Sequence, residues 1–137
     1  MSFVLDASVT LSWLYNDESD VRAATELGHL SRATCVAPSI WGLEVGNALL
    51  VAERRSRLTA AEALNVLSLL RELRVEIDPT PLTTMIVPVL AIAKAQQLST
   101  YDSAYLELAL RLGLPLATLD ARLADAAIKV GVGLFPG

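Results

Sequence analysis

Short runs of apolar residues alternate along this chain with longer stretches in which apolar positions recur every three or four residues. The short runs show no polar alternation, which is typical of strands buried on both faces, and they predict strands at 3–5, 35–37, 75–77 and 115–119. The recurring positions predict helices at 19–30, 39–57, 59–73, 84–93, 101–112 and 120–130. The pattern is that of an α/β protein.

Strands separated by helices favour right-handed crossovers and a mainly parallel sheet with helices on both faces. The tail at 133–135 predicts a weak edge strand. We therefore expect a three-layer fold with roughly four to five strands, in a single domain over 1–137. In such sheets the ligand site lies beyond the carboxyl ends of the strands, so residues that directly follow strands are the first candidates for chemistry.

Two local signals refine the helices. Thr59 and Glu62 form a capping box, in which each side chain accepts a hydrogen bond from the backbone amide of the other residue. The predicted inward face of the helix at 39–57 consists of Ile40, Leu43, Gly46, Asn47, Leu50 and Val51. Glu44 lies on the stripe with Ile40 and Asn47, so we expect it to face inward.

Composition limits the class of protein. Hydrophobic residues make up 53% of the chain and mean hydropathy is +0.48, which is too apolar for a disordered protein. The longest charge-free run, 79–93, contains three prolines and is shorter than the about 20 residues of a membrane-spanning helix. No basic segment precedes the first acid, so we expect no signal peptide. The net charge of −4 excludes a generally basic nucleic-acid coat protein, and the single Cys35 favours the cytoplasm.

Acidic residues lie where this fold places its ligand site. Asp6 and Asp120 directly follow predicted strands. Asp102 lies in the first turn of a helix, and Glu44 is expected to face inward. Burying carboxylates costs free energy, and several together repel one another. A divalent cation relieves both penalties, and oxygen-only ligands favour Mg²⁺ or Mn²⁺ over zinc.

Each acid also has a simpler interpretation. Asp6, Asp102 and Asp120 can each stabilise a helix N-terminus, at about 0.3–1 kcal/mol per charge. Glu44 can be a solvated helix residue, although its apolar neighbours argue against a polar face. Placing all of these acids at one edge of one sheet is explained better by a metal site than by separate caps.

Three stretches carry a resemblance to a known family: FVLDASV at 3–9, IWGLEVGNALL at 40–50 and STYDSAYLELALRLGLPLATLDARLADAA at 99–127. In this order they resemble the PIN-domain ribonucleases, most closely the VapC-type toxins of bacterial type II toxin–antitoxin pairs. The resemblance covers essentially the whole chain. It implies a PIN-like fold and a Mg²⁺-dependent endoribonuclease, in which Mn²⁺ can substitute, with RNA as the substrate and a VapB-like antitoxin as the partner.

The resemblance also implies roles for residues of this chain. The catalytic acids would be Asp6, Glu44, Asp102 and Asp120. Asp6 and Asp102 would chiefly hold the metal, while Glu44 and Asp120 would hold a second ion or act indirectly. The supporting residues would be Ser8, Asn47 and Thr118. Asp125, one turn beyond Asp120, is a further candidate acid.

Basic residues have two interpretations. Arg122 is the preferred cation on the substrate side, because it lies two residues after Asp120. The other arginines of interest end two predicted helices and are Arg54, Arg55, Arg57, Arg71 and Arg74. They either complement helix dipoles or form a rim that attracts phosphates or an acidic partner segment.

Large apolar side chains near the acids either fill the core or line a partner groove. They are Trp13, Leu14, Ile40 and Trp41. The resemblance favours a groove that accepts a helix of a VapB-like antitoxin. The helices at 59–73 and 84–93 would supply further groove wall or a homodimer face.

Two other function classes stay open. A receiver domain or a haloacid-dehalogenase-like phosphatase also places an aspartate after its first strand. The phosphatase normally needs a second aspartate where this chain has Ser8, and the receiver needs an adjacent acid pair. A catalytically silent PIN-like binding module would keep the fold without the reaction, and RNA cleavage in Mg²⁺, Mn²⁺ or EDTA distinguishes it.

Overall fold

The structure is a computed structural model and describes residues 2–14, 34–72 and 74–135. These residues form one parallel sheet in the order β3-β2-β1-β4. The strands are β1 (Ser2–Leu5), β2 (Thr34–Ala37), β3 (Glu76–Ile77) and β4 (Leu116–Ala117). Leu134 forms a single parallel bridge to Leu116, so the tail pairs weakly with the sheet edge as predicted.

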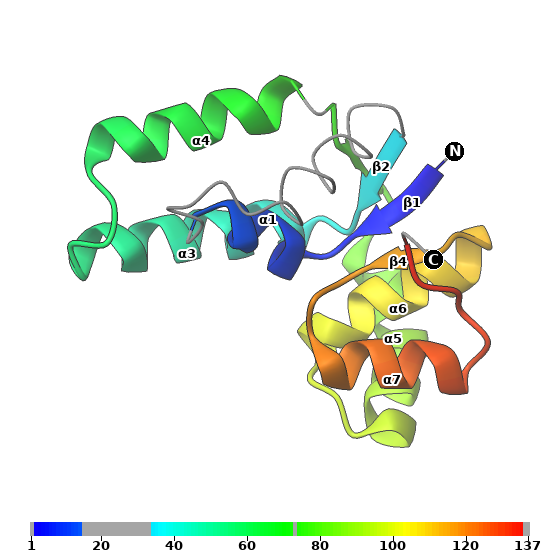
Figure 1. The fold of residues 1–137 in the computed structure, drawn as a ribbon. Coiled ribbons are helices and arrows are strands. Elements are labelled where there is room, and N and C mark those ends of the chain that lie inside the picture. Colours follow the sequence, from blue (N-terminus) through cyan, green and yellow to red (C-terminus); the bar gives the residue numbers. More distant parts are fainter. Residues whose placement is uncertain (1, 15–33, 73, 136–137) are drawn as a thin grey trace.

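Helices pack on both faces of this sheet. Those in the described ranges are α1 (Ala7–Leu14), α3 (Ile40–Arg54), α4 (Ala60–Glu72), α5 (Leu82–Gln96), α6 (Thr100–Leu112) and α7 (Ala121–Lys129). Helices α1, α3 and α4 contact one another on one side of the strands, and α5, α6 and α7 on the other (Figure 1). The predicted three-layer α/β fold is confirmed. The helix predicted at 19–30 lies outside the described residues. None of the described helices is long and apolar enough to cross a membrane.

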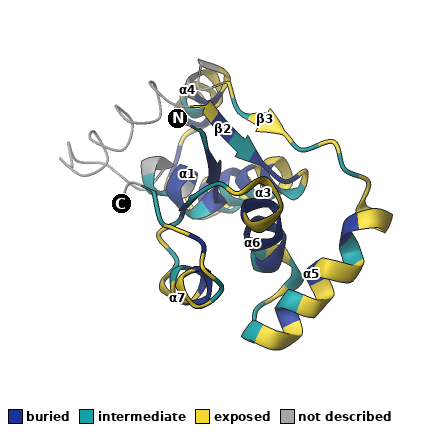
Figure 2. Ribbon diagram, turned by 90° about the vertical axis from the view of Figure 1, so that its right-hand side faces the viewer, coloured by how far each residue is buried: buried dark blue, intermediate teal, exposed yellow. Residues whose placement is uncertain are grey.

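The core lies between the sheet and the two helix layers. Phe3, Val4 and Leu5 of the central strand β1 are fully buried, as their unbroken apolar run predicts. Helix α6 is buried along most of its length, because β1 and β4 cover one side and α5 covers another. Figure 2 shows this contrast between a buried α6 and a largely exposed α5. Helix α6 is therefore a well-supported carrier for the acid in its first turn.

The buried face of α3 differs from the predicted face. Its buried residues are Trp41, Val45, Leu49 and Ala52. Leu43 is 80% exposed and Asn47 is also exposed. A helix turns by about 100° per residue, so a shift of one position moves the face by more than a quarter of a turn. Both stripes are apolar in the sequence, and packing against α1 selects between them.

Helix α4 begins as predicted but leaves apolar side chains in solvent. The Thr59 amide donates to Glu62 Oε1 at 3.0 Å, and the Glu62 amide donates to Thr59 Oγ1 at 3.1 Å, which confirms the capping box. Leu70 is buried, whereas Leu64 and Leu67 are 64% and 40% exposed. The pair α3–α4 therefore offers an apolar surface.

Candidate active site

The parallel pairing of β1 with β4 brings the first acid next to the last one. The Asp6 amide donates to the Ala117 carbonyl oxygen at 3.0 Å, so Asp6 leaves β1 beside the point where β4 ends. Thr118 and Asp120 follow β4 directly. In Figure 1, β1 ends between the two helix layers, at the edge of the sheet from which α1 begins.

Two hydroxyl groups fix the Asp6 carboxylate. Ser8 Oγ and Thr118 Oγ1 each donate to Asp6 Oδ2 at 2.6 Å. Ser8 Oγ accepts from the Leu119 amide at 2.9 Å, and Thr118 Oγ1 accepts from the Asp120 amide at 3.1 Å. Each hydroxyl has one proton, and both protons therefore point at Asp6. The arrangement orients the Asp6 carboxylate, and no hydroxyl group of the described residues donates to its Oδ1.

Asp120 lies at the same edge of the sheet and also caps the N-terminus of α7. Its Oδ1 accepts from the backbone amides of Arg122 and Leu123, at 2.9 and 3.1 Å, and so caps α7. The capping interpretation is confirmed for this residue. The second carboxylate oxygen receives no hydrogen bond from the described residues and stays available for another ligand.

Ser99, and not Asp102, caps the N-terminus of α6. Ser99 is the N-cap of α6, and its Oγ accepts from the Asp102 amide at 3.0 Å. The half-buried Asp102 carboxylate is therefore left to interact with the other acids. Gly113 ends the helix in the left-handed conformation, at φ 67°, where a side chain would be strained.

Glu44 accepts a hydrogen bond from Tyr105, a residue that the sequence alone did not identify as part of the site. The hydroxyl of Tyr105 donates to Glu44 Oε1 at 2.5 Å, across the two helix layers. Glu44 is half-buried at the margin of the buried face of α3, so it does turn toward the other acids, although by a different face from the one predicted. The sequence feature that points to Tyr105 is its position three residues after Asp102, which places both residues on the same side of one helix.

The pKa values show that Asp6, Glu44, Asp102 and Asp120, which we call the acidic cluster, act on one another. Burial raises the pKa of Asp6 above its ordinary value, the hydroxyl hydrogen bonds oppose this, and the charge of Asp120 adds to it. Burial also raises the pKa of Glu44, with contributions from the charges of Asp6 and Asp102. The pKa of Asp102 is raised by burial and then by the charges of Asp120 and Asp6. Fold and electrostatics thus bring together the acids named from the sequence.

The donor set fits a hard divalent cation in its chemistry. It consists of carboxylate oxygens that repel one another, and a positive ion would offset that repulsion. Within the described ranges, no three carboxylate, imidazole or thiol groups already converge at coordination distance around one point. Asp102 is only half-buried at the start of α6, so rotation of its side chain can bring an oxygen closer to the fixed Asp6.

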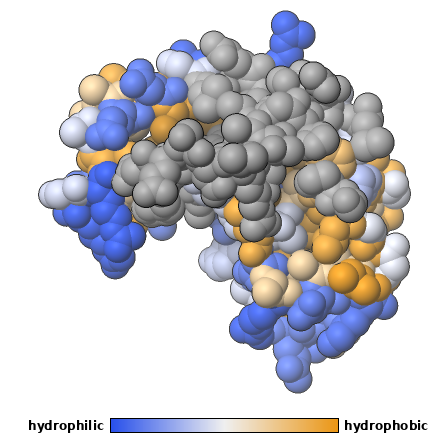
Figure 3. Space-filling model, viewed as in Figure 1, coloured by the Kyte–Doolittle hydropathy of each residue, from blue (hydrophilic) through white to orange (hydrophobic). Residues whose placement is uncertain are grey.

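The remaining predicted residues divide into near and distant ones. Arg122 Nη2 donates to the Gln97 carbonyl oxygen at 3.0 Å, and its charge lowers the pKa of Asp102, so the guanidinium lies beside the acidic cluster. Asn47 and Asp125 are exposed and form no hydrogen bond with the acidic cluster among the described residues. Hydrophilic side chains also gather at the far end of α3 (Figure 3), where Arg54 and its neighbours lie.

Trp41, predicted to line a partner groove, is largely buried and also lines a hollow at the surface. Its side chain is only 9% exposed, and its Nε1 donates to Thr10 Oγ1 at 3.3 Å, so the ring mainly fills the core. Ile40 is half-buried, and the side chains of Trp13 and Leu14 lie outside the described residues. The two interpretations of Trp41, as a core residue and as a wall of a groove, are therefore compatible.

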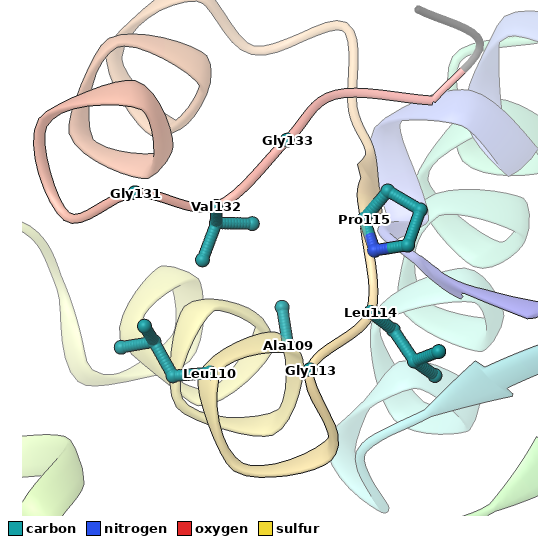
Figure 4. Close-up of a pocket in the computed structure, with 8 residues that line it drawn as sticks. All are labelled: Ala109, Leu110, Gly113, Leu114, Pro115, Gly131, Val132 and Gly133. Atoms are coloured by element: carbon teal, nitrogen blue, oxygen red, sulfur yellow. The ribbon is translucent and has the colours of Figure 1, made fainter.

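A hollow of about 360 Å³ does open between α3, α4 and β3. Its lining is mainly apolar, with two arginines, and consists of Trp41, Gly42, Val45, Gly46, Leu67, Leu70, Arg71, Arg74, Val75 and Ile77. A second hollow, of about 330 Å³, lies between the end of α6, the segment before β4 and residues 131–133 (Figure 4). That second hollow is lined by apolar residues and glycines and lies at the opposite edge of the sheet from Asp6, so it has no part in the acidic cluster.

Comparisons with known proteins agree with this geometry. The family model of the PIN domain matches residues 3–129. PAE2754 from Pyrobaculum aerophilum, a solved structure, is 26% identical with a TM-score of 0.68, over 92% of this chain and 79% of that one. FitAcB from Neisseria gonorrhoeae is 20% identical with a TM-score of 0.64, over 98% of this chain and 96% of that one, a likeness of fold. A search of curated proteins gave no match. Because the family model spans nearly the whole chain, the chain belongs to the PIN domain family.

Proposed function

We propose that this protein is an endoribonuclease that depends on Mg²⁺, with Mn²⁺ able to substitute. PIN domains are generally nucleases and usually bind divalent metal ions. The observation that carries the proposal is the acidic cluster, in which burial and neighbouring charges raise the pKa values of Asp6, Glu44 and Asp102 together. A protein that needed only helix caps would have no reason to gather carboxylates against their mutual repulsion.

Each acid has a distinct part in this proposal. Asp6 and Asp102 chiefly hold the ion, since Asp6 is fixed by two hydroxyls and Asp102 has no cap to form. Glu44 and Asp120 hold a second ion or act indirectly. When bound, the ion supplies Lewis-acid stabilisation of the charge that develops as a phosphodiester bond is cleaved.

Neighbouring polar residues support the acids. Ser8 and Thr118 orient the Asp6 carboxylate through the hydrogen bonds described above. Arg122 provides a positive charge beside the acidic cluster, where a phosphate of the RNA would approach. Asn47 is exposed about one turn beyond Glu44 on the same helix, and we assign it a contact with the substrate.

A cleavage assay tests the proposal directly. Purified protein is incubated with a mixture of structured and single-stranded RNA in Mg²⁺, in Mn²⁺ and in EDTA. We expect cleavage with either ion, no cleavage in EDTA, and recovery when Mg²⁺ is added back in excess. Metal-dependent binding of RNA without any cleavage would instead favour a silent binding module of the same family.

The motif resemblance further leads us to propose that the chain is the toxin of a VapBC-like pair, acting in the cytoplasm. The hollow between α3 and α4 supports an apolar helical partner, and Arg71 and Arg74 at its rim would attract acidic residues of that partner. The exposed apolar side chains of α5, which include Leu82 and Val87, support a homodimer face. Co-purification with the product of the adjacent gene, followed by measurement of the mass of the complex, tests both assignments.

A further inference from the structure

Tyr105 is a buried ionisable residue whose polar end reaches the acidic cluster. The residue has 0% exposure, yet its hydroxyl lies 2.5 Å from Glu44 Oε1. A buried tyrosine hydroxyl costs free energy unless it finds a hydrogen-bond partner. The position of this one is fixed by the packing of α6 against β1, β4 and α5.

We propose that Tyr105 is a positioning residue that holds the Glu44 carboxylate in the orientation needed for the ion. This inference rests on the proposed function. Glu44 is carried by α3 and Asp102 by α6, and these helices belong to opposite layers of the fold (Figure 1). The hydrogen bond from Tyr105 joins the two layers at the point where their acids approach each other.

Helix geometry makes this link direct. Tyr105 follows Asp102 by three residues, so both side chains lie on one side of α6. Any movement of α6 therefore moves Asp102 and the tyrosine hydroxyl together. Because that hydroxyl holds Glu44, the relative position of Glu44 and Asp102 depends on one rigid ring and one short hydrogen bond.

The Tyr105 hydroxyl has one proton, and the hydrogen bond of 2.5 Å directs it to Glu44 Oε1. Glu44 Oε2 receives no hydrogen bond from the described residues, so one oxygen is held and the other is free to act as a ligand.

The benefit to binding is preorganisation. A half-exposed glutamate has several rotatable bonds, and fixing it when a ligand binds costs conformational entropy. Tyr105 has already restricted Glu44 before any ion arrives. Partners of metal-ligating side chains typically contribute about 10–100-fold in metal affinity or activity.

The test compares Tyr105→Phe with wild type. Phenylalanine keeps the ring and the packing but removes the hydroxyl. We expect Mn²⁺ affinity, measured by calorimetry, to fall by about 10-fold or more, and kcat for RNA cleavage to fall while KM for RNA stays constant. The matched control is Tyr101→Phe on the same helix, which is 63% exposed and should bind Mn²⁺ like wild type.

A second comparison separates positioning from general stability. In a Glu44→Ala background there is no carboxylate to hold, so adding Tyr105→Phe should change Mn²⁺ affinity by less than about 2-fold. An equal loss in both backgrounds, or a lower melting temperature with unchanged Mn²⁺ affinity, overturns the inference. If wild type binds Mn²⁺ and cleaves RNA and Tyr105→Phe does both equally well, the inference alone fails. If wild type does neither, the proposed function fails and the inference with it.

Discussion

Thr118 Oγ1 donates a hydrogen bond of 2.6 Å to Asp6 Oδ2, although 112 residues separate the two along the chain. Thr118 Oγ1 also accepts a hydrogen bond from the Asp120 amide at 3.1 Å. The hydroxyl has a single proton, and that proton is donated to Asp6. Thr118 thereby aligns the carboxylate at the end of β1 with the turn that carries Asp120. One small side chain joins the first and last acids of the acidic cluster.

Replacing Thr118 with Val tests this relationship, because valine keeps the shape and removes the hydroxyl. We expect the free energy of unfolding to fall by about 1–2 kcal/mol and RNA cleavage to fall by about 10–100-fold. Urea denaturation and the cleavage rate measure the two effects. Thr83→Val, at an exposed position of α5, is the matched control and should alter neither. Wild-type cleavage by Thr118→Val would contradict the role given to this hydroxyl.

Asp6→Asn and Asp102→Asn should each abolish metal-dependent cleavage and leave the fold intact. An amide preserves the shape and can still accept hydrogen bonds, but it lacks the charge that holds a divalent ion. Circular dichroism checks the fold, and the RNA assay checks activity. Asp125→Asn removes the same charge from an exposed site outside the acidic cluster and should cleave like wild type. Activity in the Asp102→Asn protein would remove that residue from the site.

Two substitutions at Asp120 separate its cap from its chemistry. Asparagine is as good an N-cap as aspartate, so Asp120→Asn should keep most of the stability of α7 yet lose cleavage. Asp120→Ala removes the hydrogen bonds from the Arg122 and Leu123 amides and should cost about 1 kcal/mol more. Thermal unfolding of the two proteins gives the comparison. Equal stability of the two variants would show that the cap contributes little.

The charged Asp102 carboxylate should lower the free energy of unfolding of the metal-free protein at neutral pH. Its pKa in the folded state lies above the ordinary 3.8, so its contribution to stability is favourable at low pH and is lost as pH rises through that raised value. At neutral pH and without metal, Asp102→Asn should therefore be more stable than wild type, by up to about 1 kcal/mol after discounting for solvent screening. The difference should shrink as pH falls toward 3.8.

Melting curves with and without Mn²⁺ complete that test. Mn²⁺ should raise the melting temperature of wild type in proportion to the logarithm of its concentration, because it binds only the folded site. Asp102→Asn should gain little. If this variant instead melts below wild type without metal and both proteins respond equally to Mn²⁺, Asp102 stabilises the helix N-terminus and does not hold the ion.

Leu67→Glu tests the hollow between α3 and α4 as the partner site. Leu67 lines it and is 40% exposed, so a charge is tolerated by the fold but opposes an apolar helix. Co-purification with the product of the adjacent gene should fall by at least about 10-fold, equivalent to 1.4 kcal/mol. Leu64→Glu is the control, since Leu64 lies on the same helix outside the hollow and is 64% exposed. Trp41→Ala is a poorer probe because it removes a core side chain.

The sequence alone determined the features that depend on local interactions. The short apolar run before Asp6 predicted a buried strand with an acid at its carboxyl end. Thr59 and Glu62 predicted a capping box that forms as written, because both partners lie within one turn. Alternation of strands and helices predicted a parallel sheet, and a parallel sheet gathers its strand ends at one edge.

Tertiary structure decided everything that depends on which helix face meets which layer. The apolar residues of α3 offered two stripes, and packing against α1 buried Trp41 and Val45 while leaving Leu43 in solvent. That choice determined how Glu44 approaches Tyr105, a pairing across 61 positions that periodicity within a helix does not encode. Burial and repulsion in the acidic cluster likewise arise only when separate elements meet, because both depend on distances in space.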